Sequence, residues 1–343
     1  MIASVRAALV LFLLPMLLMM SNQVTARSQS VATPIPALLN SPAPTPGAFA
    51  GLIDVGGGRK MFLECRGEGS PAVVLVSGYR NTADVWDSEV IAPEIDQAAV
   101  LPGVAQFTRV CAYDRPGTVL DAVNVSRSDP VAQPQTAADA VADLHALLSA
   151  AGNSAPYVLV GHSYGGQVVR LFASVHPNDV AGLVLVDALP AVEQWLTPGQ
   201  WTAYQELLNQ RPNELSAYGE LETVDFAVSA VQVHEAAPLP TVPLVVLSRG
   251  LRPEFPRDLP PGFSIDALEH AWAAGQNELA ALVPQSRHEI ATRSGHAIQL
   301  EQPELVIAAV RQVVAAVRVP GTWTENEATP GASTGADVNS AVG

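Results

Sequence analysis

The sequence has few basic residues and only two cysteines. Its 18 Lys and Arg residues stand against 33 Asp and Glu residues, for a formal net charge of −15. Contacts with nucleic-acid phosphates require basic patches, so the composition predicts no nucleic-acid partner. Two cysteines alone cannot build a metal site, and no His/Cys cluster has zinc-ligand spacing. The run Gly56-Gly57-Gly58 lacks the spacing and the following helix of a phosphate loop. We therefore expect no metal, nucleotide or other cofactor.

Long apolar runs are also scarce, and the one near the start of the chain is short. It covers residues 7–20 after Arg6, is interrupted by Pro15 and precedes the small residues of Val24-Thr25-Ala26. A membrane-spanning helix needs about 20 apolar residues, whereas this layout is typical of a secretory signal peptide. We predict a signal peptide over residues 1–26 and a secreted or cell-envelope location for a bacterial protein. The alternative is an uncleaved anchor, the one case in which we expect membrane contact.

The remaining chain divides into a tether, a large domain and a tail. Residues 27–50 are rich in Pro, Ser, Thr and Ala, which predicts an extended tether. The chain as a whole is 48% hydrophobic and 15% charged, which favours a packed domain over residues 51–319. Residues 320–343 are polar and without periodicity, so we predict a disordered tail.

Short apolar runs alternate with helical patterns along this domain. The predicted strands are Ala72–Val76, Val110–Tyr113, Tyr157–Val160, Leu183–Val186 and Leu244–Leu247, and the predicted helices are Thr136–Ala151, Gly166–Val175 and Pro303–Val317. Strands that are apolar at nearly every position suit a parallel sheet buried on both faces. The alternation predicts an α/β fold with a mostly parallel, doubly wound sheet.

Two segments depart from the alternation. Leu52–Val55 and Lys60–Cys65 flank the glycine run and predict a hairpin, hence antiparallel strands at the N-terminal edge of the sheet. Residues 190–240 place aromatic and leucine side chains at helical spacing without a clear strand. We predict a helical lid inserted at the rim of the sheet.

The stretch "YVLVGHSYGG" contains a candidate nucleophile. Ser163 lies between an apolar strand and a predicted helix, with Gly161 and Gly165 two positions away on either side. A serine on a sharp strand-to-helix turn adopts strained backbone angles, and its neighbours must be small to avoid collision. The flanking strand and helix supply that context, so we predict that Ser163 is a nucleophile.

The chain resembles the α/β-hydrolase fold superfamily over roughly residues 50–318. The resemblance rests on "GHSYGG", the preceding "AVVLVSG", the segment "VCAYDRPG" and "SGHAIQLEQPE". It is greatest to the serine-nucleophile, esterase-like branch and to exported actinobacterial hydrolases. It implies that His296, on a loop before the last helix, is the general base that accepts the proton of Ser163. It also implies that His162 packs structurally.

The acid that would orient His296 has three candidates. Members of the superfamily usually carry it after the strand written here "PLVVLSRG", but no Asp stands at the expected offset. Glu254 and Asp258 lie further along this segment. The other known location is the end of the preceding strand, where "GLVLVD" supplies Asp187, 24 residues after Ser163. We favour Asp187 as the acid and keep Glu254 and Asp258 as alternatives.

The resemblance also implies an oxyanion hole and a disulfide. The backbone N–H of Tyr164 would be one donor and that of Tyr79 the other, although Ser77 stands where the family commonly has His. Asp114 and Arg115 of "YDRPG" are interpreted as structural. Cys65 and Cys111 fall on strands that this fold places side by side, so we predict that they form a disulfide closing a loop of about 46 residues.

These features predict a secreted serine hydrolase that cleaves carboxylic esters. The partner is a small-molecule ester, with an apolar group suggested by the aromatic lid. An amidase, a peptidase or an acyltransferase would use the same three residues. A catalytically silent binding protein of the cell envelope is the alternative from a different class. The Ser at the turn disfavours aspartate-nucleophile dehalogenases and epoxide hydrolases.

Overall fold

A computed structural model of the chain describes residues 47–87, 99–121, 124–211, 213–216, 218–255 and 258–323. The predicted signal peptide, nearly all of the tether and residues 324–343 of the tail lie outside the described residues. The described strands are β1 (Phe49–Asp54), β2 (Lys60–Arg66), β3 (Val73–Val76), β4 (Val110–Tyr113), β5 (Tyr157–His162), β6 (Val180–Val186), β7 (Leu244–Arg249) and β8 (Arg287–Ala291). They form one sheet in the order β1-β2-β4-β3-β5-β6-β7-β8.

The strand directions confirm the predicted fold class. Strands β4, β3, β5, β6, β7 and β8 pair in parallel, whereas β1 with β2 and β2 with β4 pair antiparallel. The predicted hairpin is present, and its turn uses Gly56, Gly57 and Gly58, all with positive φ. The antiparallel edge and the parallel body are therefore both as predicted.

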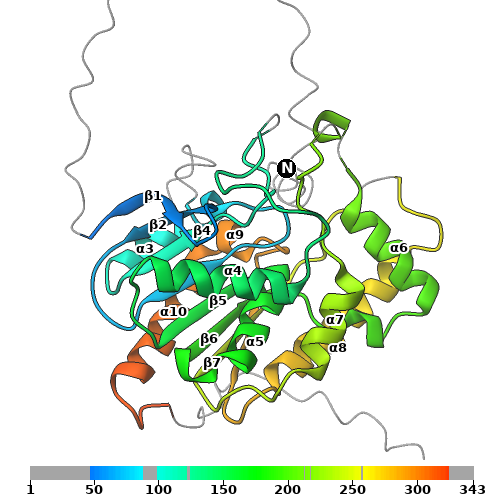
Figure 1. Cartoon of the computed structure of the whole chain (residues 1–343). Coiled ribbons are helices and arrows are strands. Elements are labelled where there is room, and N and C mark those ends of the chain that lie inside the picture. The colour runs from blue at the N-terminus through cyan, green and yellow to red at the C-terminus, as the bar shows by residue number, and fades with distance from the viewer. Residues whose placement is uncertain are drawn as a thin grey trace, which may run out of the picture.

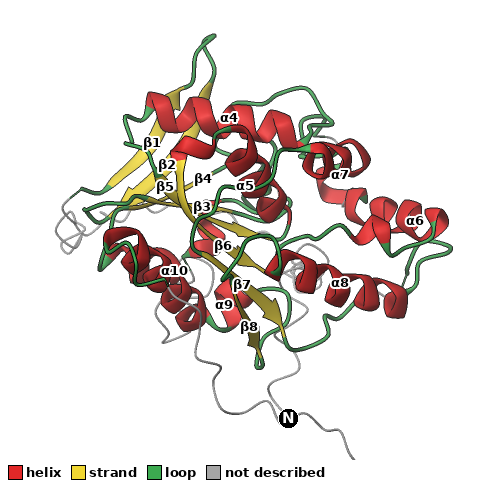
Figure 2. Cartoon of the chain, turned by 90° about the horizontal axis from the view of Figure 1, so that it is seen from below, coloured by secondary structure: helices red, strands yellow, loops and turns green. Residues whose placement is uncertain are grey.

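Helices cover both faces of the sheet (Figure 2). Their bounds are α3 (Val100–Ala105), α4 (Ala137–Ala150), α5 (Tyr164–Val175), α6 (Pro198–Asn209), α7 (Phe226–Glu235), α8 (Ile265–Ala280), α9 (Ile298–Glu301) and α10 (Pro303–Arg318). Helices α4 and α5 lie on one face, and α10 lies on the other, where it contacts α3. Successive residues of a strand point to opposite faces, so Val74 and Val76 pack on the α4–α5 side while Val73 and Leu75 pack on the α10 side. Burial on both faces explains why the strands read as continuous apolar runs.

The segment predicted as a lid is helical. It contains α6 and α7 together with the short 3₁₀ helices Val192–Gln194 and Asn213–Leu215. Helices α6 and α7 lie beside α8 at one side of the sheet (Figure 1). Helix α6 begins with a capping box: the Thr197 hydroxyl accepts from the Gln200 N–H, and the Gln200 side chain accepts from the Thr197 N–H.

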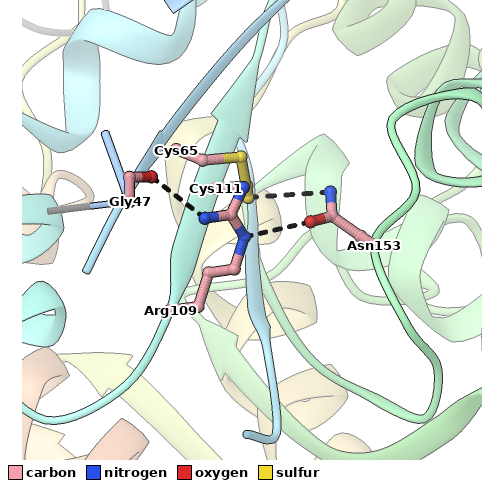
Figure 3. Close-up of a disulfide and its surroundings, with 5 residues drawn as sticks. All are labelled: Gly47, Cys65, Arg109, Cys111 and Asn153. Carbon is pink, nitrogen blue, oxygen red and sulfur yellow. Dashed lines mark hydrogen bonds between the residues drawn. A yellow bond between two sulfur atoms is a disulfide. The ribbon is translucent and has the colours of Figure 1, made fainter. Parts of the chain in front are cut away.

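Cys65 and Cys111 form a disulfide between β2 and β4 (Figure 3). The two residues are register partners on antiparallel strands, and both are buried. The Asn153 amide donates to the sulfur of Cys111 at 3.8 Å and accepts from Arg109 at 3.1 Å. The disulfide ties the antiparallel edge of the sheet to its parallel body.

None of the described helices is long and apolar enough to cross a membrane.

Candidate active site

Ser163 occupies the sharp turn between β5 and α5. It is the N-terminal cap of α5, with φ 51° and ψ −122°, which are values that side-chain-bearing residues rarely adopt. A Cβ atom on Gly161 would lie 2.6 Å from the Gly165 carbonyl oxygen, and one on Gly165 would clash with the Val76 carbonyl oxygen. A Cβ on Gly166 would clash with Ala188. Gly161 and Gly165 are therefore required by close backbone approach, as predicted, and Gly166 is a third such position.

The sheet places Asp187 beside Ser163. His162 and Val186 are register partners at the ends of the parallel strands β5 and β6, so the residues that follow them leave the sheet at the same level. Asp187 also has a positive φ, 37°, and its side chain is fully buried. The Ser163 N–H donates to the Val186 carbonyl at 3.2 Å, which holds the two turns together.

His296 contacts Asp187 from the loop between β8 and α9. Its Nδ1 atom lies 2.6 Å from Oδ2 of Asp187. Glu254 and Asp258, the two alternative acids, are exposed side chains of the segment after β7. The structure therefore brings the predicted base together with Asp187, the acid that the sequence favoured.

Asp187 is surrounded by hydrogen-bond donors. Oδ2 accepts from the Arg249 guanidinium at 2.8 Å, and Oδ1 accepts from the Trp272 indole N–H at 2.9 Å and from the Arg249 backbone N–H at 3.2 Å. Burial by itself raises the pKa of Asp187, but Arg249, His296 and Trp272 outweigh it and hold that pKa well below its usual range. An ionised carboxylate can only accept hydrogen bonds, so the proton between Asp187 and His296 lies on Nδ1 of His296. Nε2 of His296 is then unprotonated and can accept a proton.

Sequence reasoning missed Arg249 and Trp272. Arg249 ends β7, the strand next to β6, and it also donates to Glu269 at 2.7 Å. Trp272 lies on α8, and its indole ring is 5.4 Å from the His296 ring and 4.5 Å from the Arg249 guanidinium carbon. The only signal in the sequence was the position of Arg249 at the end of "PLVVLSRG".

His162 supports the loop that carries His296. Its Nε2 atom lies 2.9 Å from the His296 carbonyl oxygen, so that nitrogen carries the proton and donates. Burial, together with the nearby His296, lowers the pKa of His162 to about 3. The imidazole is therefore neutral, and it joins the nucleophile turn to the loop of the base, in line with the structural role predicted for it.

The other side of Ser163 is formed by the loop after β3. Val76 and Gly161 are register partners, which places Ser77-Gly78-Tyr79 next to the nucleophile turn. A Cβ on Gly78 would lie 2.8 Å from Nδ1 of His162, so this position must be glycine. The backbone of Tyr79 and the start of α5 at Tyr164 thus flank Ser163, where the two predicted oxyanion donors belong.

A buried ion pair holds this loop in place. Arg115 donates to the carbonyl oxygens of Ser77 and Gly78 at 2.7 and 2.6 Å, and its Nε donates to Glu222 at 2.7 Å. Glu222 belongs to the lid segment and also accepts from the Arg80 N–H. The side chains of Arg115 and Glu222 are each 4% exposed. The lid is therefore connected to the candidate oxyanion loop through Arg115, and Glu222 is a residue that sequence reasoning missed.

Asp114 organises the adjoining backbone. Its Oδ1 accepts from the Ala83 N–H at 2.8 Å, and its Oδ2 accepts from Nε of Arg127 at 2.6 Å. The Asp114 side chain is fully buried. These contacts and those of Arg115 are structural, as predicted for both residues.

A cavity of about 280 Å³ lies away from this cluster, between α5, α7 and α8. Its lining includes Gln167, Arg170 and Glu278 but not Ser163, Asp187 or His296. The cavity follows α5 away from the nucleophile turn, so it is not where Ser163 would meet a substrate.

Comparison with known families agrees with this architecture. Residues 73–309 match the sequence model of the alpha/beta hydrolase family, and this match covers more than half of the chain. The chain belongs to the alpha/beta hydrolase family. The strands β3 to β8, the nucleophile turn and the loop of His296 fall inside the matched range, whereas β1 and β2 precede it.

Individual relatives of this hydrolase are distant. Uncharacterized protein YqjL of Bacillus subtilis (strain 168) is 26% identical over 255 residues, which are 72% of this chain and 85% of that protein. "Probable transporter efuK" of Hormonema carpetanum is 28% identical over 187 residues, 53% of this chain but only 24% of that protein. A solved hydrolase from Pseudomonas aeruginosa PA01 superposes with a TM-score of 0.51 at 20% identity, over 78% of this chain and 98% of that one. At this identity the superposition establishes the fold alone.

Proposed function

We propose that the chain is a serine hydrolase that cleaves carboxylic esters through an acyl-enzyme on Ser163. The observation that carries the proposal is the 2.6 Å contact between His296 Nδ1 and Asp187 Oδ2, with Asp187 level with Ser163 at the end of the neighbouring strand. A nucleophile, a base and an acid that orients the base are the parts that acyl transfer requires.

Each residue of the proposed site has one task. Nε2 of His296 takes the proton of Ser163 as its hydroxyl oxygen attacks the ester carbonyl, and returns it to the departing alcohol. Asp187 holds Nδ1–H and stabilises the imidazolium formed in that step. The N–H groups of Tyr79 and Tyr164 donate to the oxyanion of the tetrahedral intermediate. Water then attacks the acyl-enzyme, releasing the acid and restoring Ser163.

Aromatic side chains near the site support an ester with an apolar group. Tyr204 of α6 interacts electrostatically with Asp187 and Arg249. Its ring is 6.3 Å from that of Phe263 and 6.1 Å from that of Trp201. On the other side, Phe226 of α7 packs against the rings of Tyr79 and Tyr164 at 5.3 and 5.8 Å. Tyr204, Phe226 and Tyr164 are themselves buried, so they make the interior around the site apolar, and this favours apolar acyl or alcohol groups.

Export is part of the same proposal. The signal-peptide pattern of residues 1–26 and the buried Cys65–Cys111 disulfide both suit a protein that acts in an oxidising compartment outside the cytoplasm. The resemblance to exported actinobacterial hydrolases is consistent with this location and stays a prediction.

A panel of p-nitrophenyl esters of increasing acyl length tests the proposal. Wild type should hydrolyse the panel, Ser163→Ala should not, and Ser149→Ala, which changes an exposed serine of α4, should match wild type. Parallel assays with anilides and with added alcohol acceptors identify an amidase or an acyltransferase. Absence of turnover in every assay would favour a binding protein.

A further inference from the structure

We propose that His145, His176 and Asp179 form a binding site for a divalent transition-metal ion, with Zn²⁺ as the fitting species. One donor atom from each of the three residues lies within 4.8 Å of the donor atoms of the other two. Two imidazole nitrogens and one carboxylate oxygen are a ligand set that suits zinc, with a fourth position left for water.

One donor–donor distance in this cluster is close to that of a metal site. The Nε2 atom of His145 is 3.7 Å from Oδ2 of Asp179. Two ligands 2.0–2.2 Å from one tetrahedral zinc ion are about 3.4 Å apart. Small side-chain rotations would therefore close the site around an ion.

The two histidine rings pack against each other and against one buried phenylalanine. Their rings stack at 4.1 Å with an interplanar angle of 5°. Phe172, which is fully buried, contacts both rings, at 6.1 Å from His145 and 5.0 Å from His176. The Asp179 N–H donates to the His176 carbonyl at 3.0 Å and fixes the turn that carries the carboxylate. The fold thus brings the three side chains together, and the stacked rings must rotate out of their parallel arrangement for both nitrogens to point at one ion.

The place of these three residues in the fold favours a cation electrostatically and leaves them accessible to solvent. His176 is the C-terminal cap of α5, where the helix dipole favours a cation. The side chains of His145 and Asp179 are 44% and 34% exposed, so an ion can reach them from solvent.

This site is separate from the nucleophile. Helix α5 runs from Tyr164 to Val175, so it separates the two by about 18 Å at 1.5 Å per residue. A bound ion would connect α4 to the turn between α5 and β6, which makes its role structural.

Titration of the metal-free, full-length chain with ZnCl₂ against a chromophoric zinc chelator tests the site. We expect one Zn²⁺ per chain and a thermal midpoint that rises with Zn²⁺ but not with Mg²⁺, which prefers oxygen ligands. His145→Asn and Asp179→Asn should each weaken zinc binding by about ten-fold or more, a loss seen even for indirect metal partners. His270→Asn is the control, because it removes an exposed histidine that contacts Trp195 instead.

Two results would overturn the assignment. One is a wild-type chain that binds no zinc and shows no thermal shift. The other is zinc binding that His145→Asn and Asp179→Asn leave as tight as in the control. Circular dichroism checks that each variant is folded. If a variant is unfolded, the thermal shift of the wild-type protein with Zn²⁺ decides whether the site exists.

Discussion

Ser163 and Asp187 leave two neighbouring parallel strands at the same level, and both do so with a positive φ. The values are 51° for Ser163 and 37° for Asp187, and neither residue is glycine. Strained backbone of this kind costs about 1–3 kcal/mol per residue and persists only where the surroundings enforce it. Here the register of β5 with β6 enforces both turns and places hydroxyl and carboxylate on the same edge of the sheet.

Asp187→Asn should abolish most of the activity. An amide cannot keep the proton on Nδ1 of His296, so kcat should fall by about 10⁴-fold with little change in KM. Ester kinetics on the variant measure this, and circular dichroism checks its fold. Glu254→Gln and Asp258→Asn are matched controls and should keep wild-type turnover. Near-normal turnover by Asp187→Asn would rule out this acid.

Arg249→Gln should move the pH profile. Without the guanidinium, the largest influence that lowers the pKa of Asp187 is lost, so that pKa rises. A larger share of the carboxylate is then protonated at acidic pH, so activity should begin to fall at a higher pH than in wild type. The readout is kcat/KM measured between pH 4 and 8.

The control for this positioning role is Arg252→Gln, which removes an arginine whose side chain is 53% exposed. Its pH profile should overlay that of wild type. If the pH profile of Arg249→Gln also overlays that of wild type, Arg249 does not lower the pKa of Asp187.

His162 should make the protein less stable as pH falls. Its pKa is about 3 in the folded protein and near 6.5 in an unfolded chain. Between these values the unfolded state binds a proton that the folded state does not, so stability decreases by up to about 1.4 kcal/mol per pH unit. His162→Gln keeps a donor for the His296 carbonyl and removes this titration. Denaturant unfolding at pH 4 to 7 should show a shallower decline for the variant, and parallel curves would refute the assignment.

Removing the disulfide should destabilise the fold substantially. It closes a loop of 46 residues, and the chain-entropy model gives about 4 kcal/mol for a loop of this size. Cys65→Ala/Cys111→Ala should unfold at lower denaturant concentration, and reductant should lower the stability of wild type but not of the double variant. Two titratable thiols in the non-reduced protein would contradict the pairing.

The sequence predicted the parts of the site that depend on local pattern. Ser163 stands in a steric motif, and Asp187 ends an apolar strand one helix and one strand later, so both could be placed on the same edge. The predicted strand ending at Val160 continues to His162, because Gly161 and His162 pair with Leu185 and Val186. Such extensions depend on the partner strand and are invisible in a single segment.

The residues that the sequence did not reveal act across long separations. Arg249 reaches Asp187 from another strand, and Trp272 reaches it from α8, 85 positions along the chain. Glu222 binds Arg115 from the lid, 107 positions away. None of these three residues belongs to a local motif, because their contacts depend on how the strands and the lid pack together.

Labelling with a fluorophosphonate probe tests the central claim most directly. The probe reacts with an activated serine, so peptide mass spectrometry of the labelled wild type should find the adduct on Ser163. Ser163→Ala should carry no adduct, and Ser149→Ala should be labelled like wild type. An adduct on a different serine, or no adduct on folded wild-type protein, would contradict the assignment of Ser163 as the nucleophile.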